Sequence, residues 1–222
     1  MKFLNLFLLV LLCILGPVFA QTTVSDALRF KKEYESLNGL PRSDTSFALY
    51  HTTYIPTENQ VHYIDASGAY DLLTAEFAII YFGANWCPWC RNIIPILLEE
   101  TEKAGVESLF YVDITDERDK FCIQKGKAIK EIAGTKGYYQ MLEALDAYLF
   151  PYTLTSESGK IIDTGEKRLL IPFLVVISKG SIRCAEVCTY QLEANQTRYD
   201  PMTDTQKEFL HLHLAEMVND NI

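Results

Sequence analysis

The chain has 222 residues, of which 49% are hydrophobic and 22% charged, and its 12 Phe and 13 Tyr give it the composition of a globular protein. Its formal net charge is −9 and it contains no long basic run, so it lacks the electrostatic pattern of a nucleic-acid-binding protein. This length fits one domain with added elements, and the sequence shows no internal repeat.

The N-terminus has the pattern of a secretory signal at 1–20, because Lys2 precedes a short apolar run and Ala20 ends the segment. The run is shorter than the roughly 20 residues of a spanning helix, so membrane contact is expected only through an uncleaved signal. Cys13 suggests a lipoprotein alternative, but Leu12 stands where such signals have a small residue. We therefore expect an exported protein that is secreted or held in the cell envelope.

Removal of the signal would leave an odd number of cysteines, so at least one thiol would be unpaired or paired to another molecule. An exported chain meets an environment in which disulfides persist. The remaining cysteines are Cys87, Cys90, Cys122, Cys184 and Cys188.

Helix and strand signals alternate in the first third of the chain. Ser25 can cap a helix and Gly39 can end it, which predicts a helical extension at 21–46 before a domain at 47–222. Asp65 can cap a second, short helix. The elements expected here are a helix at 21–39, strands at 47–55 and 61–64, and a helix at 66–73.

The apolar run at 77–83 predicts a central strand with both sheet faces covered, followed by Asn85-Trp86-Cys87-Pro88-Trp89-Cys90 and a helical stretch to Lys103. Two cysteines at this spacing on a helix start can form a disulfide across one turn, and the helix N-terminus stabilises a thiolate there. Half of a zinc site uses the same spacing, but the strand-to-helix context indicates redox chemistry.

A βαβ unit follows from this helix. Pro95 lies inside the helical pattern and removes one backbone hydrogen bond, which predicts a kink. Gly105 ends the helix, and the apolar run at 109–112 predicts the next strand.

The segment at about 114–167 is largely polar and predicts an inserted helical region. Apolar residues at helical spacing favour helices at 116–132, with Cys122 packed on the first of them, and at 138–149. A turn is expected at 156–159.

The last part of the chain predicts a hairpin and a terminal helix. A buried strand at 169–177 leads through a two-residue turn, Lys179-Gly180, into a strand at 182–187. A helix is expected at 203–218.

These features resemble the thioredoxin superfamily on three sequence elements: a strand ending in Ala84-Asn85-Trp86-Cys87, a proline followed by a cysteine, and a distal Ile171-Pro172 before a hairpin and last helix. The resemblance covers about 47–113 and 168–219. It implies an α/β, thioredoxin-like fold with a central mixed sheet flanked by helices.

A narrower resemblance is to exported thioredoxin-like proteins of Firmicutes, including those described as bacteriocin transport accessory proteins. It rests on the stretches 30–38, 80–83, 87–92 and 134–139.

The superfamily resemblance implies a thiol-disulfide oxidoreductase in which Cys87 is the nucleophile and Cys90 the resolving thiol. It implies that Pro172 is a cis proline beside them, and that the partners are protein or peptide thiols and disulfides together with a redox partner protein. No cofactor or metal is expected. The expected substrate groove consists of Trp86, Pro88, Trp89, Ile171, Pro172 and Cys188. Reduction and oxidation of partners both remain open.

Tyr81 is one departure from the family. Thioredoxins carry an acidic residue at this position, six before the first cysteine, which assists proton transfer at the buried thiol. A tyrosine has an ordinary pKa of about 10 and is a poor proton acceptor near neutrality.

Cys188 is the second departure, because thioredoxins usually have glycine there. A two-residue turn that pairs 178 with 181 also pairs Ile171 with Cys188, beside the expected active site. Cys184 lies about 13 Å from Cys188 along a regular strand, too far for a disulfide. Cys188 is therefore a buried cysteine, a third redox thiol, or a metal ligand with Cys87 and Cys90.

Two further functions fit the sequence. The chain can be a redox-inactive accessory or binding module for an exported peptide or transporter. It can also be a cysteine-based metal-handling protein.

Overall fold

The computed structural model describes residues 24–45 and 47–219, so the expected signal at 1–20 lies outside the described residues. The described residues form these helices: α1 (Asp26–Glu35), α2 (Ala66–Asp71), η1 (Leu72–Thr74), α3 (Pro88–Lys103), α4 (Lys136–Ala144), η2 (Asp146–Tyr148) and α5 (Asp204–Asn219). Their strands are β1 (Val61–Tyr63), β2 (Phe77–Gly83), β3 (Leu109–Asp113), β4 (Lys120–Gln124), β5 (Lys127–Ile132), β6 (Phe150–Thr155), β7 (Ile161–Arg168), β8 (Phe173–Ser178) and β9 (Ser181–Val187).

A five-stranded sheet with the order β1-β3-β2-β8-β9 forms the centre of the molecule. Strand β2 is parallel to β3 and antiparallel to β8, and all its residues after Phe77 are buried. The predicted central strand, the βαβ unit and the mixed sheet are therefore confirmed. Within the described part of the chain, no helix is long and apolar enough to span a membrane.

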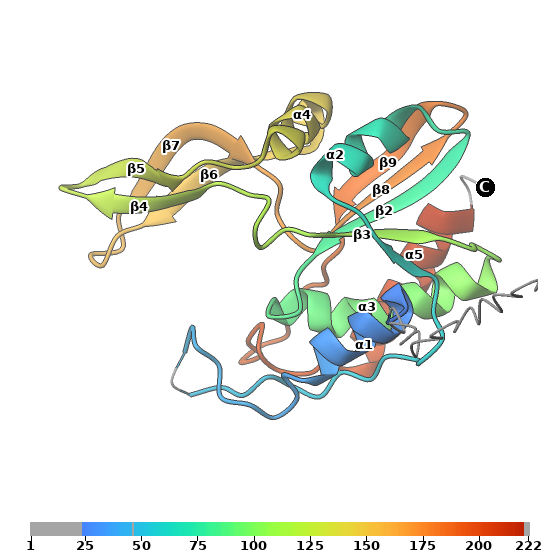
Figure 1. Cartoon of the computed structure of the whole chain (residues 1–222). Coiled ribbons are helices and arrows are strands. Elements are labelled where there is room, and N and C mark those ends of the chain that lie inside the picture. The colour runs from blue at the N-terminus through green and yellow to red at the C-terminus, as the bar shows by residue number, and fades with distance from the viewer. Residues whose placement is uncertain (1–23, 46, 220–222) are drawn as a thin grey trace, which may run out of the picture.

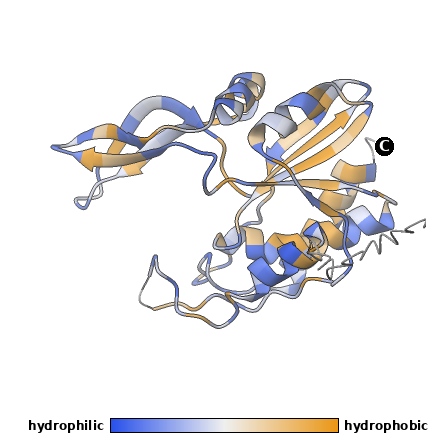
Figure 2. Ribbon diagram, in the orientation of Figure 1, coloured by the Kyte–Doolittle hydropathy of each residue, from blue (hydrophilic) through white to orange (hydrophobic). Residues whose placement is uncertain are grey.

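Helices cover both faces of this sheet (Figure 1). Ile79 and Tyr81 of β2 face a core shared with α1, α3 and α5, whereas Ile80 and Phe82 face a core shared with α2 and α4. In Figure 2 the central strands β2 and β8 are accordingly coloured mainly as hydrophobic. The alternation of side chains along β2 explains this division, since neighbouring residues point to opposite faces.

The helix that carries the two cysteines begins and ends where the sequence predicts. Cys87 is its N-cap, and Pro88 takes the first helical position, where the missing N–H costs no hydrogen bond. The helix continues past Pro95, and Gly105 follows its end with φ of +71°. A proline at this position cannot donate to the carbonyl of Arg91 one turn earlier, and that carbonyl accepts a hydrogen bond from the Thr53 hydroxyl instead, at 3.2 Å.

The strand predicted at 47–55 is not formed, apart from one isolated bridge between Pro41 and Leu49. Backbone amides of this segment donate hydrogen bonds to side chains of α1 and of the turn that follows it, and not to a neighbouring strand. The Thr53 amide donates to Asn38 Oδ1 at 3.0 Å, and the Ile55 amide donates to Glu35 Oε1 at 2.9 Å.

The N-terminal helix predicted at 21–39 is present as the shorter α1, and Ser25 caps it. Phe30 and Tyr34 of this helix are fully buried in the main core. The N-terminal region is therefore part of the core and not an appendage to it. The short helix at 66–73 is also confirmed, as α2 and η1 capped by Asp65.

The helical insertion predicted at 114–167 is wrong in most of its length, because it contains two β-hairpins and one helix. The segment at 116–132, with Cys122, is the hairpin β4–β5, and the segment after α4 is the hairpin β6–β7. Lys125 and Gly126 both have positive φ, which is the geometry of a two-residue hairpin turn. Figure 1 shows the hairpins projecting from the sheet as an arm.

In the C-terminal hairpin the predicted turn is confirmed, but the predicted strand register is wrong beyond Val176. Ser178 pairs with Ser181 as predicted, but the register shifts by one residue between Val176 and Ile177. Beyond this bulge the Cys188 amide donates to the carbonyl of Pro172 at 3.0 Å, so the predicted pairing of Cys188 with Ile171 is wrong by one residue.

Candidate active site

Cys87 and Cys90 lie where β2 ends and α3 begins, and both thiols are free. Cys87 precedes the first turn of the helix, and its sulfur accepts a hydrogen bond from the Cys90 amide at 3.4 Å. Cys87 is 4% exposed and Cys90 0%, so Cys87 is the more accessible of the two, although it is less exposed than the sequence suggests. The helix start thus presents one sulfur to its unpaired amides and buries the other.

Several groups decide the acidity of Cys87. Burial raises the pKa of the Cys87 thiol, but hydrogen bonds from Cys90 and from the Cys90 and Trp89 amides outweigh it, together with the charge of Arg42. The net result is a pKa below the ordinary value of a cysteine. A thiolate is the form that attacks disulfides, so Cys87 is chemically suited to be the nucleophile.

Cys90 has the opposite character. Burial, the hydrogen bond to Cys87 and the charge of Cys87 raise the pKa of Cys90 well above its ordinary value. Cys87 therefore ionises first and Cys90 keeps its proton. This order matches an attacking thiol and a resolving thiol.

Tyr81 lies on β2, six residues before Cys87, and is buried close to Cys90. Its ring lies over Gly83, where an added Cβ would come within 2.8 Å of the Tyr81 hydroxyl, so the glycine makes room for the ring. Burial and the charge of Cys90 raise the pKa of Tyr81 well above its ordinary value. Tyr81 is therefore no proton acceptor near neutrality.

Tyr81 belongs to a group of three buried tyrosines under the dithiol. The hydroxyls of Tyr34, Tyr81 and Tyr111 are shielded from solvent, and Tyr81 lies close enough to Cys90 and Tyr34 to affect their acidity. The Tyr81 and Tyr111 rings stack at 5.7 Å. Aromatic packing thus replaces a carboxylate at this position.

Arg42 is a site residue that sequence reasoning missed. It is 6% exposed, and its guanidinium donates to the Trp86 carbonyl at 3.0 Å and to both carboxylate oxygens of Asp44 at 2.8 and 3.0 Å. It also stacks on Tyr50, with 4.4 Å to the ring centroid. Its sequence context, Pro41-Arg42-Ser43-Asp44, signals only a turn, so no local pattern would have revealed it.

Arg91, one residue after Cys90, fixes the N-terminal region to the active-site helix. Its guanidinium is 1% exposed and donates to the carbonyls of Tyr34, Asn85 and His51 at 2.8, 3.1 and 2.9 Å, and to Asn38 Oδ1. These acceptors come from α1, from the loop after it and from the loop before Cys87. The charge is compensated by oxygens that carry only partial charges.

Cys87 faces a cavity of about 720 Å³, and most of the predicted groove residues line it. Trp86, Pro88, Trp89 and Ile171 all do so, and the Trp86 indole is held by a hydrogen bond to Thr115 at 2.9 Å. Further lining residues are Asp44, Arg118, Phe150, Arg168, Leu170, Glu186, Val187, Thr189 and Arg198.

Pro172 lies beside the dithiol. The Ile171–Pro172 bond is cis, as the family resemblance implies, and the Ile171 carbonyl lies 3.8 Å from Cys87 Sγ. Ile171 and the first cysteine therefore meet although 84 positions separate them in sequence, whereas the predicted groove residue Pro172 is not among the residues that line the cavity.

Cys188 does not join this site, in contrast to the sequence expectation. It is 1% exposed, packs into the core with α3 and α5, and is not among the residues that line the Cys87 cavity. Burial, with the nearby charge of Glu186, raises the pKa of Cys188. The sequence allows Cys188 to be a buried cysteine, a third redox thiol or a metal ligand. The structure supports the first of these interpretations.

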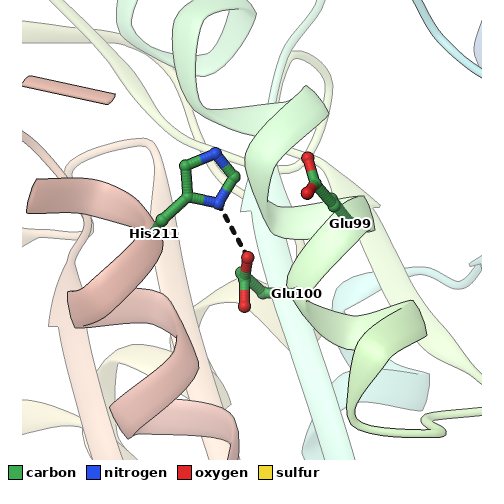
Figure 3. Close-up of side chains that lie close together, drawn as sticks. All are labelled: Glu99, Glu100 and His211. Carbon is green, nitrogen blue, oxygen red and sulfur yellow. Dashed lines mark hydrogen bonds and ion pairs between the residues drawn. The ribbon is translucent and has the colours of Figure 1, made fainter. Parts of the chain in front are cut away.

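One group of potential metal ligands occurs among the described residues, and it contains no cysteine. Figure 3 shows this group, Glu99, Glu100 and His211, between α3 and α5. His211 Nδ1 lies 2.7 Å from Glu100, and Lys103 Nζ lies 2.7 Å from Glu99 and 2.8 Å from Glu100. Lys103 bridges the two carboxylates of α3 and His211 contacts Glu100 from α5, so the cluster is a polar network that joins two helices.

The chain matches no known protein-family model, and a search of curated proteins also finds no match. Among solved structures it is similar to oxidised thioredoxin O2 from Arabidopsis thaliana (16% identity, TM-score 0.34), with 61% of this chain and 85% of that one covered. It is also similar to thioredoxin from Malassezia sympodialis (16%, 0.32, with 62% and 85% covered). A thiol:disulfide interchange protein from Chlorobium tepidum shows 14% identity and a TM-score of 0.28, with 65% and 83% covered. These scores are low, and the thioredoxin-like fold is evident from the chain's own sheet order, its dithiol at the start of α3 and its cis Pro172.

Proposed function

We propose that this chain exchanges disulfides with protein or peptide partners through Cys87 and Cys90. The observation that carries the proposal is the unequal dithiol at the start of α3, in which the pKa of Cys87 is lowered and that of Cys90 raised. Only Cys87 of the two lines the cavity, opposite Ile171.

The reducing direction has two steps. The Cys87 thiolate attacks one sulfur of a partner disulfide, a mixed disulfide forms, and the other partner sulfur leaves as a thiolate that takes a proton from water. Cys90 then attacks Cys87 Sγ, and its proton passes to the second partner sulfur as that sulfur leaves. The partner gains two electrons and two protons, and a dithiol redox partner protein restores Cys87 and Cys90.

The oxidising direction is the reverse of these steps. A partner thiolate attacks the Cys87–Cys90 disulfide, and a second partner thiol displaces Cys87. The low pKa of Cys87 favours this direction, because a stabilised thiolate is a good leaving group. A buried Cys90 without a nearby carboxylate makes the second reductive step slow.

Export and the narrower family belong to the same proposal. The signal-like sequence at 1–20 suggests a location outside the cytoplasm, where a dithiol can act on partner disulfides. The resemblance to exported Firmicute proteins of the bacteriocin transport accessory type rests on the sequence stretches alone.

The test is trapping with Cys90→Ser, which removes the resolving thiol and leaves the nucleophile. We expect a stable mixed disulfide with partner proteins in an extract of the exported fraction, visible as an adduct that a reductant releases. The matched variant Cys87→Ser/Cys90→Ser should give no adduct.

Failure to form an adduct, together with no reduction or oxidation of a model disulfide by the unmodified protein, would contradict the proposal. That result would instead favour a redox-inactive binding module.

A further inference from the structure

The cavity beside Cys87 is rich in arginine although the chain as a whole is acidic, with a formal net charge of −9. Arg118, Arg168 and Arg198 line it, and the acidic residues there are Asp44 and Glu186. A cationic patch on an anionic protein concentrates negatively charged partners at that patch.

Both acidic residues already have partners within the protein. Asp44 accepts two hydrogen bonds from Arg42, at 2.8 and 3.0 Å. Glu186 Oε1 lies 2.5 Å from His213 Nε2 of α5, a contact that is an ion pair only when the histidine is protonated. Asp44 is therefore neutralised by Arg42, and Glu186 is the one lining carboxylate left to oppose Arg118, Arg168 and Arg198.

The arginines are held against aromatic rings and not by carboxylates. Arg118 lies 5.2 Å from the Trp86 ring and Arg168 lies 4.6 Å from the Tyr152 ring. Within the described residues neither forms an ion pair, and the Nε atom of each is shielded from solvent without a hydrogen-bond partner. Their positive charges are thus not neutralised by a carboxylate of the described residues, and the planar guanidinium fork matches the geometry of a partner carboxylate.

Arg118 and Arg168 come from the two ends of the segment inserted into the thioredoxin-like sheet. Arg118 follows β3, before the hairpin β4–β5, and Arg168 is the last residue of β7. Trp86 brings Arg118 next to the dithiol, because it immediately precedes Cys87. The insertion thus places charge at the redox site as well as forming the projecting arm.

We infer that the partner is a polypeptide whose reacting cysteine is flanked by aspartate or glutamate residues. Its carboxylates bind Arg118 and Arg168 while its sulfur meets Cys87, and the exchange of bonds and electrons is that given above. This inference rests on the proposed disulfide exchange and names the class of partner for it.

The experiment uses three synthetic peptides, each closed by one disulfide and identical except for Glu, Gln or Lys beside the cysteines. We expect kcat/KM for reduction to be about tenfold higher for the Glu peptide than for the Lys peptide at low salt, because each ion pair adds a modest attraction. The preference should shrink as salt screens the charges, which tests the inference without any substitution.

Arg118→Gln, Arg168→Gln and the double variant should each reduce the ratio of Glu-peptide to Lys-peptide kcat/KM, with the double variant near one. The control is Arg183→Gln, which makes the same charge change on an exposed residue near the hairpin turn of β9, away from the Cys87 cavity. It should keep the preference.

Equal rates for the three peptides would overturn the inference and leave the proposed function standing. An equal loss of preference in Arg183→Gln and Arg118→Gln would also overturn it, because it would show attraction by net charge and not by the groove. No exchange with any peptide would overturn both the inference and the proposed function.

Discussion

Arg42 contributes to the acidity of Cys87 from a loop that precedes it by 45 positions, the difference between their residue numbers. Its guanidinium is fixed by Asp44 and by the Trp86 carbonyl, so its charge stays beside the dithiol. An opposite charge held near a thiol favours the thiolate. A single residue of the N-terminal region thus lowers the pKa of the Cys87 thiol.

Arg42→Gln should raise the pKa of Cys87, because it removes a positive charge that stabilises the thiolate. With a higher pKa, less Cys87 thiolate exists at a given pH, so alkylation of Cys87 becomes several-fold slower near neutrality. The measurement is the pH dependence of iodoacetamide alkylation in a Cys90→Ser background.

Arg42→Lys provides the matched control, since it keeps the charge but loses the planar fork. Its alkylation midpoint should lie between those of the parent and Arg42→Gln. Identical midpoints in all three proteins would show that Arg42 has no electrostatic effect on Cys87.

At the scale of elements, helices α2 and α4 hold the inserted segment on the sheet. Gly137 makes this contact possible, because a Cβ there would lie 2.3 Å from the Ser67 backbone nitrogen and 2.7 Å from the Ala66 carbonyl carbon. Backbone atoms of a neighbouring helix cannot rotate away as a side chain can. The approach of the two helices therefore depends on a residue without a side chain.

Gly137→Ala should lower the free energy of unfolding by about 1–3 kcal/mol, because the helices must separate to admit the methyl group. Urea denaturation followed by circular dichroism measures this change.

Gly68→Ala, in the facing helix, should have the opposite sign. A Cβ there would meet Asp65 Oδ1 at an ordinary 3.4 Å, and alanine in a helix is favoured over glycine by about 0.5–1 kcal/mol. A destabilised Gly68→Ala or an unaffected Gly137→Ala would contradict this account of the contact.

For the molecule as a whole, Arg91 joins the N-terminal region to the thioredoxin-like part of the fold. Its guanidinium binds oxygens from three separate stretches of the chain, while Phe30 and Tyr34 fill the core beside it. The boundary expected near residue 47 therefore does not separate two independent parts.

Arg91→Gln should destabilise the protein by about 3 kcal/mol or more, because several buried carbonyls lose a charged donor at once. Amide hydrogen exchange in α1 should also become faster, since this helix loses its attachment to α3. The measurements are urea denaturation and exchange followed by mass spectrometry.

Arg91→Lys should fall between the parent and Arg91→Gln, since an ammonium cannot reach all of these acceptors. Unchanged exchange in α1 for Arg91→Gln would show that packing of Phe30 and Tyr34 alone holds the helix.

Local patterns in the sequence sufficed for the sheet core and for the positions of the two thiols. The apolar run of β2, the cysteine spacing with Pro88, and the Lys179-Gly180 turn each act over a few residues, so they can be recognised without knowing the fold. The Lys125-Gly126 turn carries the same signal, but polar strands around it resemble an exposed helix. Periodicity alone therefore misassigned β4 and β5.

Only the tertiary structure decided the surroundings of the CPWC dithiol. Arg42, Arg118 and Arg168 approach Cys87 or its cavity from segments distant in sequence, and charge acts through space and not along the chain. One bulge in β9 shifted Cys188 from opposite Ile171 to opposite Pro172, and the residue is buried in the core with α3 and α5 and does not line the cavity. The sequence thus determined which sulfurs can react, and long-range packing determined their acidity and the charge of the groove they face.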